Sequence, residues 1–177
     1  QYSFTIHETN GDGEARLKHY SYIYLDNRMD IIVGAREDIT EFSEKDVLTN
    51  GYNRRGFIRN TERILNTSDD RTKYAVLFFN VQNFKAVNEL FGVESGDIVL
   101  QNIYRTLKHS KLSPIITARV DSDHFVCLIE KKNLDFTELS AVCANKFTKD
   151  GKRMNLIIRC GIFYVEEKPM KIPGMID

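Results

Sequence analysis

The stretch Ala118-Arg119-Val120-Asp121-Ser122-Asp123-His124-Phe125-Val126 places a polar group between two apolar runs. The runs Ile115–Val120 and His124–Ile129 have the composition of strands, so the stretch predicts a β-hairpin that turns at Asp121-Ser122. Asp and Ser favour turns because their side chains bond the nearby backbone. Two carboxylates and an imidazole are also ordinary ligands of a divalent ion. On this stretch alone, a polar turn and a metal site both remain open.

Outward from the hairpin, helix-like and strand-like stretches alternate from about residue 46 to residue 177. Apolar spacing predicts helices over 53–65, 84–91, 96–107 and 134–147, and strands over 74–79, 115–120, 124–129 and 155–164. The run Tyr74–Phe79 is continuously apolar, which is typical of a strand buried on both faces. This order predicts an α/β (α+β) sandwich with a mixed central β-sheet flanked by helices.

Composition limits the possible functions. The 177 residues suffice for one domain with a full core and part of another. No apolar run approaches the roughly 20 residues of a membrane span, so we expect no membrane contact. The chain has 25 basic residues (Lys and Arg) and 25 acidic residues (Asp and Glu). It therefore has no net charge that would attract nucleic acid. The cysteines Cys127, Cys143 and Cys160 lie in apolar surroundings without CxxC spacing, which predicts buried free thiols and a cytoplasmic location.

The N-terminal part, residues 1–41, has a different pattern from residues 42–177. It predicts an antiparallel meander of three strands over 2–7, 15–25 and 29–35, joined by turns at 10–13 and 26–27. Three short strands hardly bury a core, so this part should pack on something or belong to a larger domain.

The residues that end this part resemble the closing strands of a PAS sensor domain. Tyr24-Leu25-Asp26 and then Ile31–Glu41, with its G…DIT-E letters, carry the resemblance. Only the C-terminal part of such a domain is covered, and the helical half that usually encloses a ligand is missing. Cofactor sensing by this piece is therefore not expected. In the PAS family the DIT segment leads into a signalling helix, so residues 37–46 are either such a connector or a plain solvated linker.

Four blocks in residues 42–177 resemble, in order, the motifs of the GGDEF diguanylate cyclase family. Asp46–Phe57 is similar to D-x-L-T-G-L-x-N-R-R-x-F, Phe79–Asn88 to F-D-I-D-x-F-K-x-I-N, Gly92–Leu100 to G-x-x-x-G-D-x-x-L, and Arg119–Phe125 to R-x-G-G-D/E-E-F. The resemblance implies a nucleotidyl cyclase-like fold. It also implies a reaction in which an antiparallel homodimer joins two GTP molecules into cyclic di-GMP with the help of Mg²⁺.

The guanine-reading half of the family's site is retained. Asn88 and Asp97 match the base-contacting Asn and Asp, and an amide beside a carboxylate suits the donors and acceptors of guanine. The resemblance also implies that Phe84 and Leu100 form walls of this nucleotide site. It implies that Lys85 and Arg119 supply positive charge to the site. The alternative is that Asn88 and Asp97 cap the ends of helices.

The metal half is altered. Asn80 stands where the family has its first metal-binding Asp, although Mg²⁺ prefers carboxylates and phosphates. Asp123 keeps the acidic third position of the last motif, whereas His124 replaces the acidic fourth, and imidazole is a poor ligand for a hard ion. We therefore expect no metal at these positions and regard Asp123 as a catalytic remnant.

The two glycines of the last motif are also replaced, by Asp121 and Ser122. Glycine lets the backbone approach a phosphate and adopt positive φ. The Asp121 carboxylate would instead face the triphosphate, and two unit charges at ~4 Å with an effective dielectric near 20 repel by about 4 kcal/mol. The resemblance therefore implies a degenerate domain whose cyclase activity is absent or very weak.

Two further family features differ. The product-inhibition motif R-x-x-D would fall near residues 112–115 and is absent there. The family continues after Tyr164 into a helix and a last strand, so Ile172–Asp177 reads as the approach to that helix and the domain as C-terminally incomplete.

Two functional hypotheses follow from the resemblance. The first is a regulatory module that binds GTP or nothing and relays a PAS-derived signal, with an EAL-type cyclic di-GMP phosphodiesterase in the same polypeptide as its partner. The second is a weak Mg²⁺-dependent diguanylate cyclase that works as a homodimer with Asp123 as its surviving metal ligand.

Overall fold

The chain forms two compact units in a computed structural model that describes residues 2–9, 15–24, 32–39 and 43–167. The first unit ends at Glu44 and the second begins at Lys45, shortly after the boundary expected from the sequence. The connector expected over 37–46 and the turns expected at 10–13 and 26–27 lie wholly or partly outside the described residues, as does the end of the chain from residue 168.

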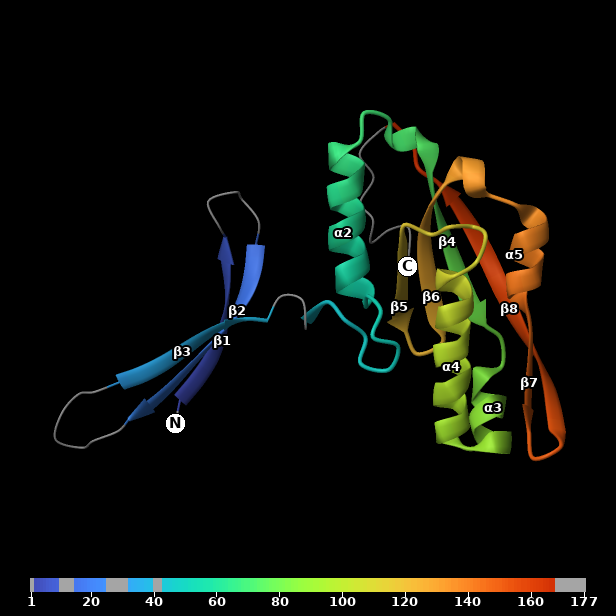
Figure 1. Cartoon of the computed structure of the whole chain (residues 1–177), viewed down its shortest axis with the longest axis horizontal. Helices are drawn as coiled ribbons and strands as arrows, with labels where there is room; N and C mark the ends of the chain where they lie inside the picture. The colour runs from blue at the N-terminus through green and yellow to red at the C-terminus, as the bar shows by residue number, and fades with distance from the viewer. Residues whose placement is uncertain (1, 10–14, 25–31, 40–42, 168–177) are drawn as a thin grey trace. The chain divides into compact units, whose positions relative to one another are not determined.

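The first unit is the three-stranded antiparallel meander that the sequence predicts (Figure 1). Its strands are β1 (Tyr2–Thr9), β2 (Ala15–Tyr24) and β3 (Ile32–Asp38), in the order β1-β2-β3. Across the sheet, Lys18 and Arg36 both approach the Glu8 carboxylate, at 2.9 and 2.5 Å. The hydrogen bond from Lys18, ahead of one from Tyr20, holds the pKa of Glu8 below its usual value.

The second unit is an α/β sandwich, so the predicted fold class is confirmed. Its sheet has the order β5-β6-β4-β8-β7. The strands are β4 (Tyr74–Val81), β5 (Ile116–Asp121), β6 (His124–Glu130), β7 (Ala144–Lys149) and β8 (Lys152–Tyr164). The helices are α2 (Arg54–Thr67), α3 (Phe84–Phe91), α4 (Val93–Lys108) and α5 (Phe136–Cys143), with short 3₁₀ turns at Arg71–Lys73 and Lys131–Asn133.

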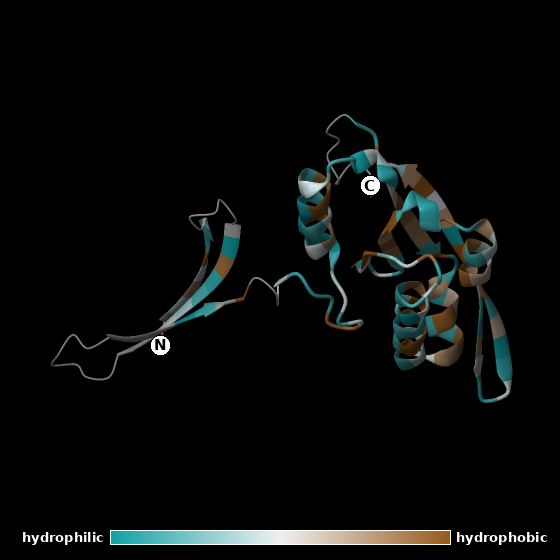
Figure 2. Ribbon diagram, turned by 45° about the horizontal axis from the view of Figure 1, so that its top comes forward, coloured by the Kyte–Doolittle hydropathy of each residue, from teal (hydrophilic) through white to brown (hydrophobic). Residues whose placement is uncertain are grey.

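Strand β4 contributes residues to both hydrophobic cores of this unit. Leu77 and Phe79 belong to the core beneath α3, α4 and α5, whereas Val76 belongs to the core beneath α2, where Phe57 is fully buried. Alternate residues of a strand point to opposite faces, so a continuous apolar run can fill both cores. Helices therefore cover the sheet on both sides (Figure 1), and the hydrophobic residues concentrate in its central strands (Figure 2).

The sheet is less mixed than expected. Every pair of strands in the described residues is antiparallel. The parallel component there is a single bridge between Tyr52 and Ala118, at the edge formed by β5. The expectation of a mixed sheet was wrong because β5–β6 and β7–β8 are hairpins, and β4 runs opposite to both of its neighbours.

The helix predicted over 134–147 is half helix and half strand. Helix α5 ends at Cys143, and β7 follows as an edge strand paired with β8. Phe147 on β7 packs edge-on against Phe91 of α3, with ring centroids 5.3 Å apart. The turn after β7 has Asp150 at φ 50° and Gly151 at φ 75°. Asp-Gly with both residues at positive φ is typical of a tight hairpin turn. The residues before this turn therefore pair as a strand instead of continuing the helix.

The expectation of buried free thiols holds in part. All three cysteines are free, but only Cys127 is buried, while Cys143 and Cys160 are half-buried. Burial raises the pKa of the Cys127 thiol to about 12. Among the described residues, none of the helices has the length and apolar character to span a membrane.

Alkaline pH is expected to destabilise the second unit through Cys127. Below the ordinary thiol pKa of 9.0 the thiol is protonated in both folded and unfolded chains. Between 9.0 and about 12 the unfolded chain loses this proton and the folded chain keeps it. Stability should therefore fall by up to about 1.4 kcal/mol per pH unit. Urea unfolding of wild type and Cys127→Ala across this range should give a smaller decline in the variant, and equal declines would contradict the assignment.

Candidate functional site

The predicted hairpin forms with β5 and β6 as its strands, and the polar residues make its turn. Asp121 pairs with His124, and a bulge at Val120 separates this pair from Arg119 paired with Phe125. The Asp121 carboxylate accepts a hydrogen bond at 2.7 Å from the backbone N–H of Ser122. The interpretation as a polar turn is therefore confirmed, because the side chain of Asp121 stabilises the turn that it begins.

Four polar side chains form a hydrogen-bonded chain beside this turn, which we call the Asn80 chain: Gln82, Asn80, His124 and Asp123. Gln82 donates from Nε2 to Asn80 Oδ1 at 2.6 Å, which orients the Asn80 amide. The Asn80 Nδ2 group then faces Nε2 of His124, its cross-strand neighbour. With Nε2 as the acceptor, His124 carries its hydrogen on Nδ1, which lies 3.3 Å from Asp123 Oδ1.

The Asn80 chain does not suit Mg²⁺. Asn80 presents an N–H toward His124 rather than an oxygen, and the one carboxylate of the chain, Asp123, also accepts a hydrogen bond from Ser122 Oγ at 3.0 Å. Within the described ranges, no three His, Cys, Asp or Glu residues converge as a metal-binding group. Mg²⁺ in proteins is usually held by one or two carboxylates together with waters and phosphates, and the one carboxylate of the Asn80 chain is already hydrogen-bonded, so these residues fit the ion poorly.

The Arg119 side chain binds other residues of the domain, whereas the resemblance implied that it contacts a nucleotide. Its Nε and Nη2 donate to the Ser122 carbonyl oxygen at 3.0 and 2.7 Å, and Nη1 lies 3.2 Å from Asp46 Oδ2. The side chains of Arg119 and Asp46 are only 16% and 18% exposed. The guanidinium therefore joins the turn of the hairpin to the loop before α2, and its place on a nucleotide remains a prediction.

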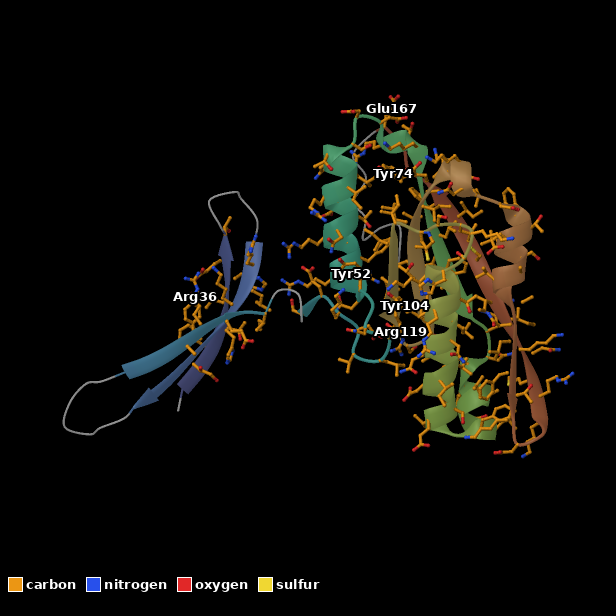
Figure 3. The ribbon with its side chains drawn as sticks, in the orientation of Figure 1. Arg36, Tyr52, Tyr74, Tyr104, Arg119 and Glu167 are labelled. Atoms are coloured by element: carbon orange, nitrogen blue, oxygen red, sulfur yellow. The ribbon has the colours of Figure 1, made fainter. Side chains whose placement is uncertain are left out.

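The loop that provides Asp46 is shaped by its own sequence. Asp46 Oδ1 accepts hydrogen bonds from the N–H and hydroxyl of Thr49 at 2.8 and 2.7 Å. A side chain on Gly51 would come within 2.4 Å of the Tyr104 ring, so only glycine fits there. Figure 3 shows Tyr52, Tyr104 and Arg119 close together, below α2 and beside α4. Sequence reasoning missed Asp46 as the partner of Arg119.

Replacing Arg119 with alanine should destabilise the second unit. The change leaves the Asp46 carboxylate without its cation and removes two charge-assisted hydrogen bonds to Ser122, which together cost about 2–3 kcal/mol. Urea unfolding would measure the loss. Arg119→Lys is the matched control, because it keeps the charge near Asp46 but cannot make the paired hydrogen bonds. It should lose less than Arg119→Ala; wild-type stability in Arg119→Ala would contradict the role.

The predicted guanine-binding residue Asn88 lies against the first turns of α4. A Cβ on Gly96 would stand 1.9 Å from Asn88 Oδ1 and 3.0 Å from the Phe84 ring, so the absence of a side chain at Gly96 makes room for the amide. The Oδ1 atom of Asn88 is buried and has no hydrogen-bond partner. An unpaired buried acceptor costs free energy, and a ligand donor could satisfy it.

Asp97 is the next residue on α4 and lines an open cleft of about 550 Å³. The cleft is also lined by Asp46, Gln101 and Arg119. Neither Asn88 nor Asp97 caps a helix, since the residues at the N-caps of α3 and α4 are Asn83 and Gly92. The alternative interpretation of these two residues as caps was therefore wrong.

Two other predicted site residues, Lys85 and Leu100, differ strongly in exposure. The Lys85 side chain is 89% exposed and forms an ion pair at 3.5 Å with Glu89, one helical turn further along α3. Leu100 is 2% exposed and belongs to the core beneath α4, so it presents almost no surface to a ligand. Phe84 is half-buried and packs on the same core. Of the predicted nucleotide site, the structure therefore brings Asn88 and Phe84 together around Gly96, directly before Asp97.

The five-stranded sheet, its helices and the motif residues at the ends of β4, β5 and β6 define a nucleotidyl cyclase-like domain. Residues 43–172 match the family described as diguanylate cyclase, GGDEF domain, and the chain belongs to this family.

Curated relatives and solved structures agree with this assignment. The chain is 28% identical over 112 residues to the probable diguanylate cyclase DgcT of Escherichia coli, a match that covers 63% of this chain and 24% of DgcT. It is 38% identical over 64 residues to the bifunctional diguanylate cyclase/cyclic di-GMP phosphodiesterase MucR of Pseudomonas aeruginosa, over 36% of this chain and 9% of MucR. The match therefore covers about a quarter of the length of DgcT and about a tenth of the length of MucR.

Among solved structures, the GGDEF domain of FimX from Pseudomonas aeruginosa is similar with a TM-score of 0.61. The sequences are 17% identical, and the superposition covers 74% of this chain and 85% of that domain. At this identity the similarity supports the fold alone.

Proposed function

We propose that this GGDEF domain is a regulatory module of cyclic di-GMP signalling that does not synthesise cyclic di-GMP. The observation that carries the proposal is the Asn80 chain. The family's reaction needs a 3′-hydroxyl made nucleophilic and an α-phosphate whose charge is neutralised by a metal on carboxylates. Here an amide and an imidazole hydrogen-bond to each other at the two positions where the family has acids.

The charge at the turn adds to this argument. Asp121 is exposed and places a carboxylate where the family has glycine, while Arg119 is directed to Ser122 and Asp46. A triphosphate placed at the hairpin would therefore meet a carboxylate without the cation or the metal that would offset it.

The domain retains features that fit a guanine base, and GTP binding is the second part of the proposal. The buried Oδ1 of Asn88 lacks a donor, and Asp97 presents a carboxylate to the cleft. Guanine has an N–H and an amino group on one edge, which match two such acceptors. Asn80 and His124 play no part in this contact, so GTP binding and catalysis separate in this domain.

The proposed partner is a cyclic di-GMP phosphodiesterase domain of the EAL type in the same polypeptide. MucR, which the chain matches over a short region, is described as a bifunctional cyclase and phosphodiesterase. The first unit would supply the input, as the remnant of a PAS-type sensor, and the two units would work in the cytoplasm, singly or as a homodimer. GTP bound at Asn88 and Asp97 would then alter hydrolysis by the partner domain.

The test of the first part is product formation. The protein is incubated with GTP and Mg²⁺, an active GGDEF cyclase serves as positive control, and cyclic di-GMP is measured by chromatography. We expect no product above the enzyme-free blank. The second candidate, a weak cyclase with Asp123 as its metal ligand, predicts a slow product that Asp123→Asn removes. Product at the rate of the positive control would overturn the proposal.

The test of the second part is calorimetric titration with GTP. We expect binding in wild type and loss of binding in Asn88→Ala and Asp97→Ala, while ATP serves as the nucleotide control. Equal affinity in wild type and both variants would refute the assigned base contacts. If neither the wild-type protein nor the two variants bind GTP, the domain acts through its protein surface alone. The first part of the proposal is then unaffected.

A further inference from the structure

The two half-buried cysteines are neighbours in space. Cys143 is the last residue of α5, and Cys160 lies on β8. The residue after Cys143, Ala144, pairs with Ile157 in the β7–β8 ribbon, which brings the end of α5 alongside this part of β8. Both cysteines pack against the same hydrophobic core, to which Ile158 of β8 belongs.

The two thiols interact directly. The Cys160 S–H has two acceptors within reach, the Cys143 sulfur and the Gly161 carbonyl oxygen at 3.5 Å. The hydrogen bond from Cys160 lowers the pKa of the Cys143 thiol against the opposing effect of its burial, whereas the same contact and burial raise the pKa of Cys160. Of the pair, Cys143 is therefore the thiol that ionises first, and the thiolate is the reactive form.

We propose that Cys143 and Cys160 form a reversible dithiol–disulfide pair, oxidised by low-molecular-weight disulfides of the oxidised glutathione class. The Cys143 thiolate attacks one sulfur of oxidised glutathione, which forms a mixed disulfide and releases one glutathione thiolate. Cys160 loses its proton to water and attacks the Cys143 sulfur, which forms the protein disulfide and releases the second glutathione. The protein gives up two electrons and two protons, and one oxidised glutathione becomes two reduced molecules.

This disulfide would fix the end of α5 to β8. Strand β8 pairs with β4, where Cys160 lies opposite Phe79 and Arg159 lies opposite Asn80. The cross-link would therefore stabilise the sheet next to the Asn80 chain without touching it. This modification site is independent of GTP binding, because Asn88 and Asp97 lie on other helices.

Cys127 provides an internal control. It is 2% exposed, and its pKa is raised to about 12, so it should not react in the folded protein. The experiment treats the whole protein with oxidised glutathione, alkylates the remaining thiols, and maps the peptides by mass spectrometry. We expect a disulfide between Cys143 and Cys160, no modification of Cys127, and a Tm higher by about 5–10 °C that dithiothreitol reverses.

Single variants separate the two steps. Cys160→Ser should stop at a stable glutathione adduct on Cys143, Cys143→Ser should give little adduct on Cys160, and Cys127→Ala should form the disulfide as wild type does. Circular dichroism establishes that each variant is folded, and either serine variant alone tests the pair. The proposal is overturned if oxidised wild type keeps free thiols at 143 and 160, or if the disulfide that forms includes Cys127.

Discussion

Replacing Phe79 with alanine is expected to lower the free energy of unfolding of the second unit by about 3–5 kcal/mol. Phe79 lies on the central strand β4, is fully buried, and pairs in register with Phe125 on β6 and Cys160 on β8. Removing its ring opens a cavity under α4 that the neighbouring strands cannot close, because hydrogen bonds on both sides hold β4 in place. Urea unfolding followed by far-UV circular dichroism measures the loss.

Phe136→Ala is the matched control, since it removes the same ring from a surface position. Phe136 begins α5 and is 66% exposed. Its truncation should change stability by no more than about 0.5 kcal/mol. Similar losses in the two variants would show that the burial of Phe79 does not determine its contribution.

A single methyl group at Gly96 is expected to weaken GTP binding by about tenfold or more. The Cβ of alanine would overlap Asn88 Oδ1 at 1.9 Å. The Asn88 amide is the end of a flexible side chain, so it would swing aside at little cost in stability and leave the position proposed for the guanine contact. The loss of one or two hydrogen bonds to a base corresponds to this change in Kd. Calorimetric titration of Gly96→Ala with GTP measures it.

Gly161→Ala is the control for this variant, because a Cβ at Gly161 meets nothing within 4 Å. It should bind GTP as wild type does. Unchanged affinity in Gly96→Ala, with wild type that does bind GTP, would show that Asn88 does not contact the base.

The sequence predicted the elements of the second unit where their pattern was strong. The continuous run Tyr74–Phe79 became the central strand, and the helix over 84–91 has the predicted bounds. Strand β7 was missed because Leu134–Phe147 has enough apolar residues to read as one helix. The decisive signal was the Asp150-Gly151 pair, which marks a tight turn and requires a strand before it as well as after it.

The site was less predictable than the fold, because the roles of its residues depend on partners distant in sequence. Motif spacing identified Asn80, Asn88 and His124 as the positions to inspect. It could not show that Arg119 would form an ion pair with Asp46, 73 residues away. Nor could it show that Asn80 on β4 and His124 on β6 would hydrogen-bond to each other. Which of several acceptors a polar group selects is decided by tertiary packing.

The bond between Asn80 and His124 also bears on what single mutations toward the family's two acidic residues would produce. Asn80→Asp alone would set a carboxylate against Nε2 of His124, where an N–H of the ring would occupy the oxygen that a metal ion needs. His124→Glu alone would place a carboxylate beside Asp123 with the amide of Asn80 as its nearest partner. Neither intermediate gains the ligand set that Mg²⁺ requires. On the proposed function, natural selection for cyclase activity would find no advantage at the first step, and residues 80 and 124 would have to change together.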